Sequence, residues 1–201
     1  MTGERLFKNT AMMNVYDFDN TIYDGDSTVD FYLFCLKKYP YLLRRLPFQL
    51  HSAIKYKMGK ISKTKFKEDF FCFLRLLPDT EAEVKLFWDK HESRIMEWYK
   101  KRQQADDVII SASPYFLLSE ICKRLNIQNL IASMVDWKTG KFAGGNCYGE
   151  EKWKRWQEIF PETGINEFYS DSYSDERLAK AAKRAYLVKK GRILPWQQYK
   201  K

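Results

Sequence analysis

Hydrophobic residues along the chain follow two patterns, short apolar runs and longer stretches with helical spacing. Short runs of β-branched, aromatic and aliphatic residues that end at turn residues predict strands. We expect these strands at residues 11–17, 106–111, 129–133, 167–170 and 185–188. Apolar positions three or four residues apart predict helices at residues 115–125, 150–160 and 174–183.

Two connections carry turn signals of their own. Residues 134–148 are expected to form a hairpin that turns at Lys138–Lys141. Ser113 and Pro114 fit the N-cap and the first position of the helix that follows them.

The segment from residue 28 to residue 102 has helical patterns only. Its helices are expected at residues 28–38, 40–58, 62–76 and 79–102. Pro47 should break or kink the second of these helices, because proline lacks an N–H donor and clashes with the preceding turn. Asp79 is expected to cap the fourth helix.

An apolar stripe runs along the second of these helices, through Leu43, Leu46, Leu50 and Ile54. Such a stripe is more often the core of a helical bundle than a membrane anchor, and we expect a bundle core here.

Strands that alternate with helices predict an α/β fold with a doubly wound parallel sheet. The helical segment interrupts this alternation directly after the first strand. It is therefore expected to be an inserted domain at residues 28–102, with a core domain formed by residues 1–27 and 103–201.

Composition supports one packed core plus an insertion, since 45% of the 201 residues are hydrophobic and 16% are aromatic. No secretion signal is recognisable at the N-terminus, and the longest apolar runs are too short to span a bilayer. The four cysteines, Cys35, Cys72, Cys122 and Cys147, are scattered and are expected to be reduced thiols of a cytoplasmic protein.

Positive charge is concentrated in the helical segment. Residues 28–102 hold 17 basic and nine acidic side chains, whereas the rest of the chain is close to neutral. No Asp or Glu occurs between Asp30 and Glu68, a stretch with ten Lys and Arg residues. This field favours an anionic partner, although a solvated face that only aids solubility is the alternative.

The most informative polar residues are Asp17 and Asp19, which come directly after the first strand. Side chains alternate along a strand, so two carboxylates at positions i and i+2 are expected to point the same way. Two like charges held this close repel each other unless a cation lies between them or one is protonated. The pair therefore suggests a metal-assisted nucleophile and an acid/base.

Further polar residues follow the other strands: Ser111, Lys152, Asp171 and Asp175. The carboxyl ends of parallel strands meet at one crevice, where ligands bind. Carboxylate oxygens suit Mg²⁺, a lysine can neutralise a phosphoryl group, and an aspartate can form an aspartyl phosphate. This set of residues is typical of a phosphoryl-transfer site, but the residues alone do not indicate which aspartate is the nucleophile. The structural alternatives are that Ser111 is a turn residue, that Lys152 is a solvated helix residue and that Asp175 is a helix N-cap.

With these motifs in this order, the chain resembles the haloacid dehalogenase-superfamily phosphatases. The resemblance extends from Tyr16 to Asp175 and rests on Asp17-Phe18-Asp19-Asn20-Thr21, Ile109-Ile110-Ser111, Lys152 and Asp171-Ser172-Tyr173-Ser174-Asp175. It implies a Rossmann-like sheet, and the helical insertion resembles a C1-type cap. Tyr169–Ser172 is similar to the fourth motif of the phosphoserine phosphatase-like branch.

The resemblance also implies roles for individual residues. Asp17 would attack phosphorus, and Asp19 would act as general acid and then as general base. Asp17, the Asp19 carbonyl and Asp171 would bind Mg²⁺, while Asp175 would act through a metal-bound water or hold Lys152. Ser111, Lys152, Thr21 and Ala112 would contact the phosphate. Asn20 replaces a common glycine in a position that asparagine tolerates. Asp26 lies near a substrate-reading glutamate of phosphoserine phosphatases, and because aspartate is shorter, phosphoserine itself is not assured as the substrate.

The function expected from the sequence is hydrolysis of a small phosphorylated metabolite by a Mg²⁺-dependent phosphomonoesterase with an aspartyl-phosphate intermediate. The basic and aromatic segment leaves two alternatives open. One is a phospholipid head-group phosphatase, for example for phosphatidylglycerol phosphate, that is peripheral to anionic membranes. The other is a nucleic-acid-binding module.

Overall fold

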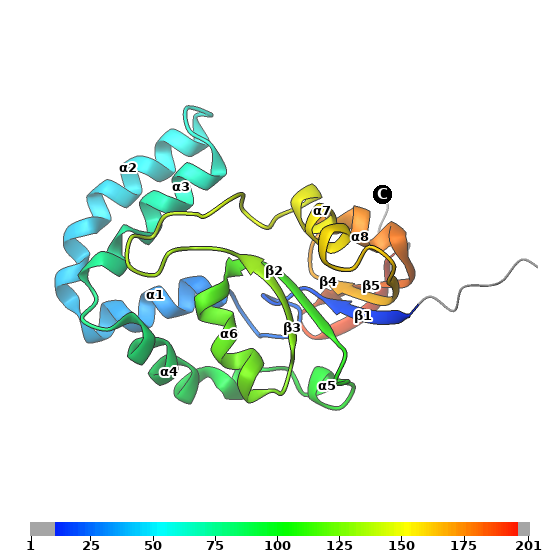
Figure 1. Ribbon diagram of the computed structural model, residues 1–201. Coiled ribbons are helices and arrows are strands. Elements are labelled where there is room, and N and C mark those ends of the chain that lie inside the picture. The colour runs from blue at the N-terminus through cyan, green and yellow to red at the C-terminus, as the bar shows by residue number, and fades with distance from the viewer. Residues whose placement is uncertain (1–10, 197–201) are drawn as a thin grey trace, which may run out of the picture.

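The computed structural model describes residues 11–196, which fold around a six-stranded sheet (Figure 1). The strand order is β3-β2-β1-β4-β5-β6, in which the first five strands are parallel and β6 is antiparallel to β5. The strands are β1 (Met12–Tyr16), β2 (Val108–Pro114), β3 (Asn129–Ser133), β4 (Gly164–Ser170), β5 (Ala182–Lys189) and β6 (Arg192–Pro195). The predicted α/β class and parallel sheet are confirmed, whereas β6 was not predicted from the sequence.

Alternating residues of the strands build two hydrophobic cores, one on each face of the sheet. On one face, Val15 and Phe168 pack against α7 (Glu150–Ile159) and α8 (Glu176–Ala181). On the other face, Tyr16 and Tyr169 stack on each other, with ring centroids 4.9 Å apart, and pack beside α6 (Tyr115–Arg124). Because both faces are covered, the central strands read as continuous apolar runs.

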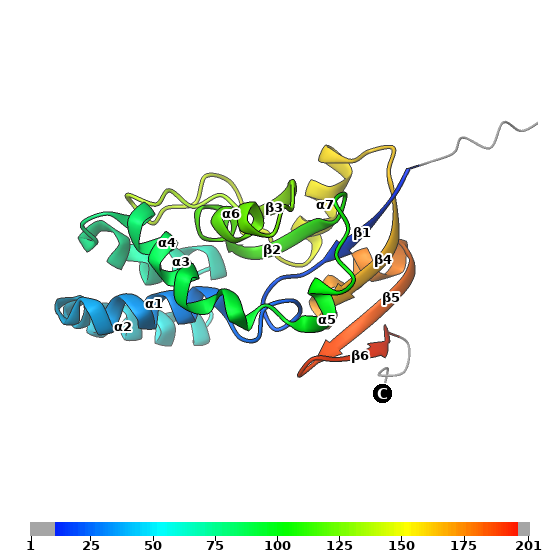
Figure 2. The same ribbon diagram turned by 90° about the horizontal axis from the view of Figure 1, so that it is seen from below.

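The helical segment lies between β1 and β2 in the chain, as predicted. Residues 27–91 of this segment occupy one end of the molecule, opposite β5 and β6, whereas its last helix, at residues 97–100, lies beside the sheet (Figure 2). Its elements are α1 (Ser27–Lys38), η1 (Pro40–Arg45), α2 (Leu46–Lys57), α3 (Lys63–Phe70), η2 (Phe71–Leu76), α4 (Thr80–His91), η3 (Glu92–Arg94) and α5 (Glu97–Lys100). The division into two domains at residues 28 and 102 stays a prediction.

Local signals within this segment act as expected at Pro47 and Asp79. Pro47 lies in the first turn of α2 and separates it from the 3₁₀ turn before it. The carboxylate of Asp79 caps α4 by accepting from the backbone N–H of Ala82 (3.1 Å). The single helix predicted for residues 79–102 is wrong. The chain leaves the helix after His91 because Ile95 must extend and pair with Tyr23 in the loop that follows β1.

Two connections also differ from prediction. The hairpin predicted for residues 134–148 is shorter than expected and covers residues 134–143. Its turn lies at Lys138–Lys141 as predicted, with an antiparallel bridge between Val135 and Phe142 and backbone bonds from Asp136 N–H to the Lys141 carbonyl and from Ala143 N–H to the Met134 carbonyl, both 2.8 Å. This hairpin also bonds to the helical segment, since the Phe142 N–H donates to Glu68 Oε1 (3.1 Å) and Arg75 Nε donates to the Thr139 carbonyl (3.0 Å). Ser113 is not an N-cap either: β2 continues to Pro114, and no side chain caps α6.

The apolar stripe through Leu43, Leu46, Leu50 and Ile54 is not a bundle core. All four side chains are exposed on the outer side of η1 and α2. Hydrophobic spacing indicates an amphipathic helix, but it does not say which face turns inward. No helix within residues 11–196 has the length and apolar character needed to cross a bilayer.

Trp88 of α4 joins the helical segment to the sheet core. Its ring packs edge-on against Phe18 and Tyr23, with centroids 5.9 Å and 5.5 Å away. Its indole N–H donates to the carbonyl of Leu117 in α6 (2.7 Å). The side chain is fully buried, so its removal would leave a large cavity.

We expect Trp88→Ala to lower the free energy of unfolding by about 3–5 kcal/mol, because a large buried aromatic side chain is lost. Urea denaturation followed by circular dichroism measures this change. Trp137→Ala removes a partly exposed tryptophan and serves as the control, with an expected loss of less than about 1 kcal/mol. Equal losses in the two variants would contradict the joining role of Trp88.

Candidate active site

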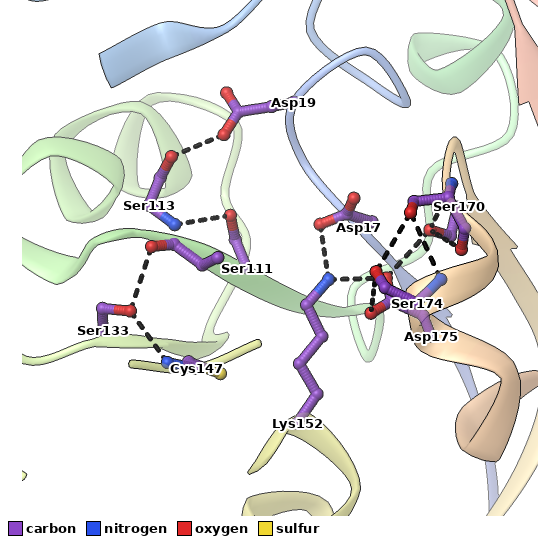
Figure 3. A network of polar contacts seen from close by, with 12 residues as sticks. Asp17, Asp19, Ser111, Ser113, Ser133, Cys147, Lys152, Ser170, Ser174 and Asp175 are labelled. Carbon is purple, nitrogen blue, oxygen red and sulfur yellow. Dashed lines mark hydrogen bonds and ion pairs between the residues drawn. The ribbon is translucent and has the colours of Figure 1, made fainter. Parts of the chain in front are cut away.

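Polar side chains gather where the chain leaves the carboxyl ends of β1, β2 and β4 (Figure 3). Asp17 follows β1, and its N–H donates to the Tyr169 carbonyl of β4 (2.8 Å), which keeps it at the sheet edge. Ser111 lies in β2, and Asp171 follows β4 directly. The predicted convergence of strand ends thus brings these residues to one edge.

Lys152, in the first turn of α7, lies between two of these carboxylates. Its Nζ donates to Oδ1 of Asp17 (2.8 Å) and to Oδ2 of Asp175 (2.7 Å), and its side chain is only 3% exposed. The hydroxyl of Ser170 donates to the same Asp175 oxygen (2.9 Å). The alternative of a solvated Lys152 is therefore wrong. Asp175 holds Lys152 and makes no side-chain cap of α8.

Charges in this cluster are only partly balanced. Burial raises the pKa of Asp17 to about 7, although Lys152 lowers it. Burial also raises the pKa of Asp171, which Lys189 and Lys152 lower. For Lys152, burial lowers the pKa but the Asp17 and Asp175 carboxylates raise it more, so the amine stays protonated. The two ammonium groups of Lys152 and Lys189 thus face the three carboxylates of Asp17, Asp171 and Asp175, and the site favours an additional cation.

Asp19 does not share the environment of Asp17, which corrects the expectation that both carboxylates point the same way. β1 ends at Tyr16, so the alternation of a strand does not extend to either aspartate. Oδ1 of Asp19 accepts from the backbone N–H of Ser27 (2.7 Å), and Oδ2 accepts from the Ser113 hydroxyl (2.5 Å). Burial and the charge of Asp26 together raise the pKa of Asp19 to about 6, although the hydrogen bonds from Ser113 and Ser27 lower it.

The loop that carries the two aspartates is a tight turn. The N–H groups of Thr21, Ile22 and Tyr23 all point to the Phe18 carbonyl. Asn20 has a φ of 55°, the left-handed conformation that asparagine tolerates. The Thr21 hydroxyl is fully buried and has no hydrogen-bond partner. Its predicted contact with phosphate stays a prediction.

Three further residues predicted to bind substrate also have structural partners. Asp26 is exposed and caps α1, since its Oδ1 accepts from the Val29 N–H (3.0 Å). Ser111 is buried, and its hydroxyl accepts from the Ser113 N–H (3.1 Å). The Ala112 carbonyl accepts from the Ser133 hydroxyl (3.0 Å). Contacts of these residues with a substrate stay predictions.

Lys67 of α3 reaches this region from the helical segment and was missed in the sequence. Its Nζ donates to the Ala112 carbonyl (2.9 Å) and to Oδ1 of Asn146 (3.0 Å). Burial lowers the pKa of Lys67 to about 8, and Asp19 and Asp26 act in the opposite direction. Nothing in the sequence separates Lys67 from nine other basic residues of the acid-free stretch. Ser113 and Ser170 were missed for the same reason, since serines give no local signal of their partners.

The available oxygen atoms set limits on a metal site. No group of three or more His, Cys, Asp or Glu side chains within residues 11–196 is arranged to hold an ion. Of the four predicted ligands, Asp175 directs its carboxylate to Lys152 and Ser170. Asp19 directs its carboxylate to Ser27 and Ser113, which leaves its main-chain carbonyl as the predicted ligand. Asp17 and Asp171 lie close enough for each charge to affect the other. Two carboxylates with main-chain oxygens and water fit Mg²⁺, which keeps several waters.

Comparison with known proteins gives a family and a fold. A family model described as haloacid dehalogenase-like hydrolase matches residues 15–180. No curated protein sequence matches the chain.

Several solved structures share the fold. A protein of unknown function from Bordetella pertussis Tohama I is 20% identical with a TM-score of 0.72, over 88% of this chain and 89% of that one. A phosphoserine phosphohydrolase-like protein from Francisella tularensis subsp. tularensis SCHU S4 is 20% identical with a TM-score of 0.55, over 87% and 86%. A phosphoserine phosphatase in a phospho-aspartyl intermediate analogue form is 17% identical with a TM-score of 0.53, over 88% and 86%.

These solved structures confirm the predicted α/β fold. The family match, which covers more than half of the sequence, also confirms the predicted class of enzyme. The chain belongs to the haloacid dehalogenase-like hydrolase family.

Proposed function

We propose that the protein is a Mg²⁺-dependent phosphomonoesterase that acts on a small phosphorylated metabolite through an aspartyl phosphate. The observation that carries this proposal is the buried Lys152 between Asp17 and Asp175 at the sheet edge. A structural ion pair needs one carboxylate, whereas this lysine holds two and Asp171 stands beside them. Surplus negative charge at a ligand-binding edge is the arrangement that a phosphate with its cation requires.

Asp17 is the nucleophile in this proposal. Lys152 holds Oδ1, so Oδ2 is the oxygen that bonds to phosphorus while the bond from phosphorus to the alcohol oxygen breaks. The fixed ammonium also neutralises charge that develops on the phosphoryl group. Mg²⁺, held by the Asp17 and Asp171 carboxylates and the Asp19 carbonyl, would supply further charge neutralisation.

Asp19 is the general acid and base. A pKa of about 6 allows it to hold a proton near neutral pH and to give it to the departing alcohol oxygen. The same carboxylate, now ionised, then takes a proton from the water that hydrolyses the aspartyl phosphate. Its bonds to Ser27 and Ser113 fix the orientation for both steps.

Lys67 adds a positive charge from the helical segment to this site. Its two hydrogen-bond acceptors, a carbonyl and an amide oxygen, are uncharged. A largely buried ammonium without a carboxylate at contact distance is stabilised when an anion binds. We therefore assign Lys67 to the binding of the anionic substrate, on the side of the general acid Asp19.

A nucleic-acid-binding function is less consistent with the structure. The aromatic residues of the basic stretch would have to be exposed to stack on bases. Phe31 and Tyr32 are instead buried in the core. Of the exposed aromatic residues, Tyr41 packs against Tyr39 and Tyr56 stacks on Phe66, with ring centroids 5.7 Å and 5.2 Å apart, whereas Phe48 is 48% exposed. A phospholipid head group as the substrate stays the second candidate, favoured by the exposed stripe on α2.

The nucleophile is tested with Asp17→Asn. We expect the wild-type protein to hydrolyse an aryl phosphate with Mg²⁺ and to stop when the metal is chelated. Asp17→Asn should lose at least about a thousandfold in kcat, because an amide cannot form the acyl phosphate. Asp24→Asn changes an exposed carboxylate of the same loop and should keep wild-type activity. Undiminished turnover by Asp17→Asn would refute the assignment.

Metal binding is tested by stability rather than by activity. A carboxyl group with a raised pKa in the folded state binds its proton more tightly there than in the unfolded chain. The stabilisation of the folded state by this tighter proton binding is complete below about pH 4. It is lost as the pH rises through the folded-state pKa values of about 6 for Asp19 and about 7 for Asp17. In chelator, the Tm should therefore fall between pH 5 and pH 8 by at least about 4 °C.

Mg²⁺ should raise the Tm more at pH 8 than at pH 5, because it binds ionised carboxylates. Asp17→Asn serves as the comparison, and it should show a shallower dependence on pH and no Mg²⁺ response. Identical pH slopes for the two proteins in chelator, or an equal response to Mg²⁺, would count against this site.

The role of Lys67 is tested by Lys67→Met, which keeps the length of the side chain and removes its charge. We expect the KM for an aryl phosphate to rise by about 10- to 100-fold with a smaller change in kcat. Lys65→Met removes an exposed lysine of the same helix that pairs with Asp69, and its KM should stay at the wild-type value. A KM unaffected by Lys67→Met would exclude a contact with substrate.

A further inference from the structure

The outer side of α2 carries an exposed apolar stripe. Leu46, Leu50, Ile54 and Met58 follow one another at intervals of four residues and are 37%, 55%, 57% and 60% exposed. Leu43 in the preceding 3₁₀ turn is 51% exposed. Single exposed hydrophobic residues are ordinary, but a continuous stripe on one helix indicates an interaction surface. We call these five residues the α2 stripe.

The inner side of the same helix is polar, which is the reverse of an ordinary surface helix. Gln49 and Ser52 are buried against the protein. Gln49 accepts from the Tyr32 hydroxyl (2.6 Å) and donates to the Phe70 carbonyl (2.8 Å), and Ser52 donates to Oδ2 of Asp69 (2.7 Å). These buried groups are all satisfied, so α2 is held by hydrogen bonds in an orientation that turns its apolar side outward.

Basic residues accompany the stripe. η1, α2 and the turn that follows hold five exposed Lys and Arg residues and no acid: Arg44, Arg45, Lys55, Lys57 and Lys60. The wider stretch from Asp30 to Glu68 also lacks an acidic residue between its ends. An apolar stripe with basic neighbours is the chemistry of a helix that lies in the interface of an anionic bilayer. The aliphatic side chains enter the acyl boundary, and the long basic side chains reach the head groups.

The charge and the side-chain types of this surface also argue against a second copy of the chain or a nucleic acid as its partner. A second copy of the chain on this surface would bring two sets of basic residues together without acids to neutralise them. A nucleic acid would meet mainly the aliphatic side chains of the α2 stripe. Stacking on bases would be confined to Tyr41, Phe48 and Tyr56, which are 40%, 48% and 37% exposed.

We propose that α2 and η1 form a docking surface for an anionic lipid bilayer, with the α2 stripe inserted and its basic neighbours at the phosphates. The surface lies at the outer edge of the helical segment (Figures 1 and 2). α3 packs directly against α2. When α2 is docked on the lipid surface, α3 is the next helix behind it and carries Lys67 into the site. This proposal does not depend on the proposed function, because binding to lipid is measured without turnover.

The experiment is co-sedimentation of the full chain with vesicles. The wild-type protein should pellet with phosphatidylcholine–phosphatidylglycerol vesicles and stay in solution with phosphatidylcholine alone. Added salt should weaken the binding. Leu50→Glu/Ile54→Glu places two charges in the stripe and should reduce the partition to the anionic vesicles by at least about tenfold. Since both positions are exposed, the far-ultraviolet circular dichroism of this variant should match the wild type.

Ile159→Glu is the matched control. Ile159 ends α7 in the sheet region and is 54% exposed, close to the 57% of Ile54, so the substitution tests whether any exposed isoleucine suffices. It should bind vesicles as the wild type does. Wild-type binding by Leu50→Glu/Ile54→Glu, or no binding of the wild type at low salt, would overturn the proposal. So would a dimer seen by sedimentation velocity that the double variant abolishes, because the stripe would then belong to a second copy.

Discussion

The buried ammonium of Lys152 between Asp17 and Asp175 is the constraint on which the site depends. Its three members come from the end of β1, the first turn of α7 and the residue before α8, so the sheet and two helices must be in place together. Removing one member of a buried, paired cluster leaves an uncompensated charge and destabilises by about 3–5 kcal/mol. Lys152 and Lys189 cannot neutralise the carboxylates of Asp17, Asp171 and Asp175 when all three are ionised. The fold thus creates a local excess of negative charge, and this is where we propose that a divalent cation binds.

The helical segment meets this charge cluster from two directions. At its start, the Ser27 N–H at the beginning of α1 holds the carboxylate of Asp19. In its middle, Lys67 of α3 reaches the Ala112 carbonyl beside Ser111. The long loop before α7 joins in, since its Asn146 accepts from the same lysine. A shift of the segment would therefore move Asp19, the proposed general acid, and Lys67, the proposed substrate-binding lysine, at the same time. In the proposed function, this coupling would let an insertion far from Asp17 in the sequence determine the substrate.

Local sequence patterns predict the parts of this structure that depend on local interactions. The strand before Asp17, the caps and the order of the polar residues are of this kind, and the family resemblance added the roles of those residues. Local sequence patterns give wrong or incomplete predictions where tertiary contacts determine the backbone conformation or the partner of a side chain. Residues 79–102 have helical spacing throughout, yet Ile95 extends to pair with Tyr23. The hydroxyl of Ser113 bonds to Asp19, 94 positions away, and no local feature announces that bond. The partners of Lys67 lie 45 and 79 positions away, so its role also emerges only in the folded chain.

The orientation of α2 is the clearest case in which the pattern and the fold give different information. The spacing of Leu46, Leu50 and Ile54 predicts an apolar face, and burial of that face would have removed it from water at a gain of about 1.5–3 kcal/mol for each side chain. The fold instead buries Gln49 and Ser52, whose hydrogen bonds merely replace those made with water. For a monomer in water, turning the apolar side of α2 outward brings no gain in folding free energy. The gain appears only when a second apolar phase covers the stripe, and the basic residues around the stripe favour the anionic lipid surface that we propose.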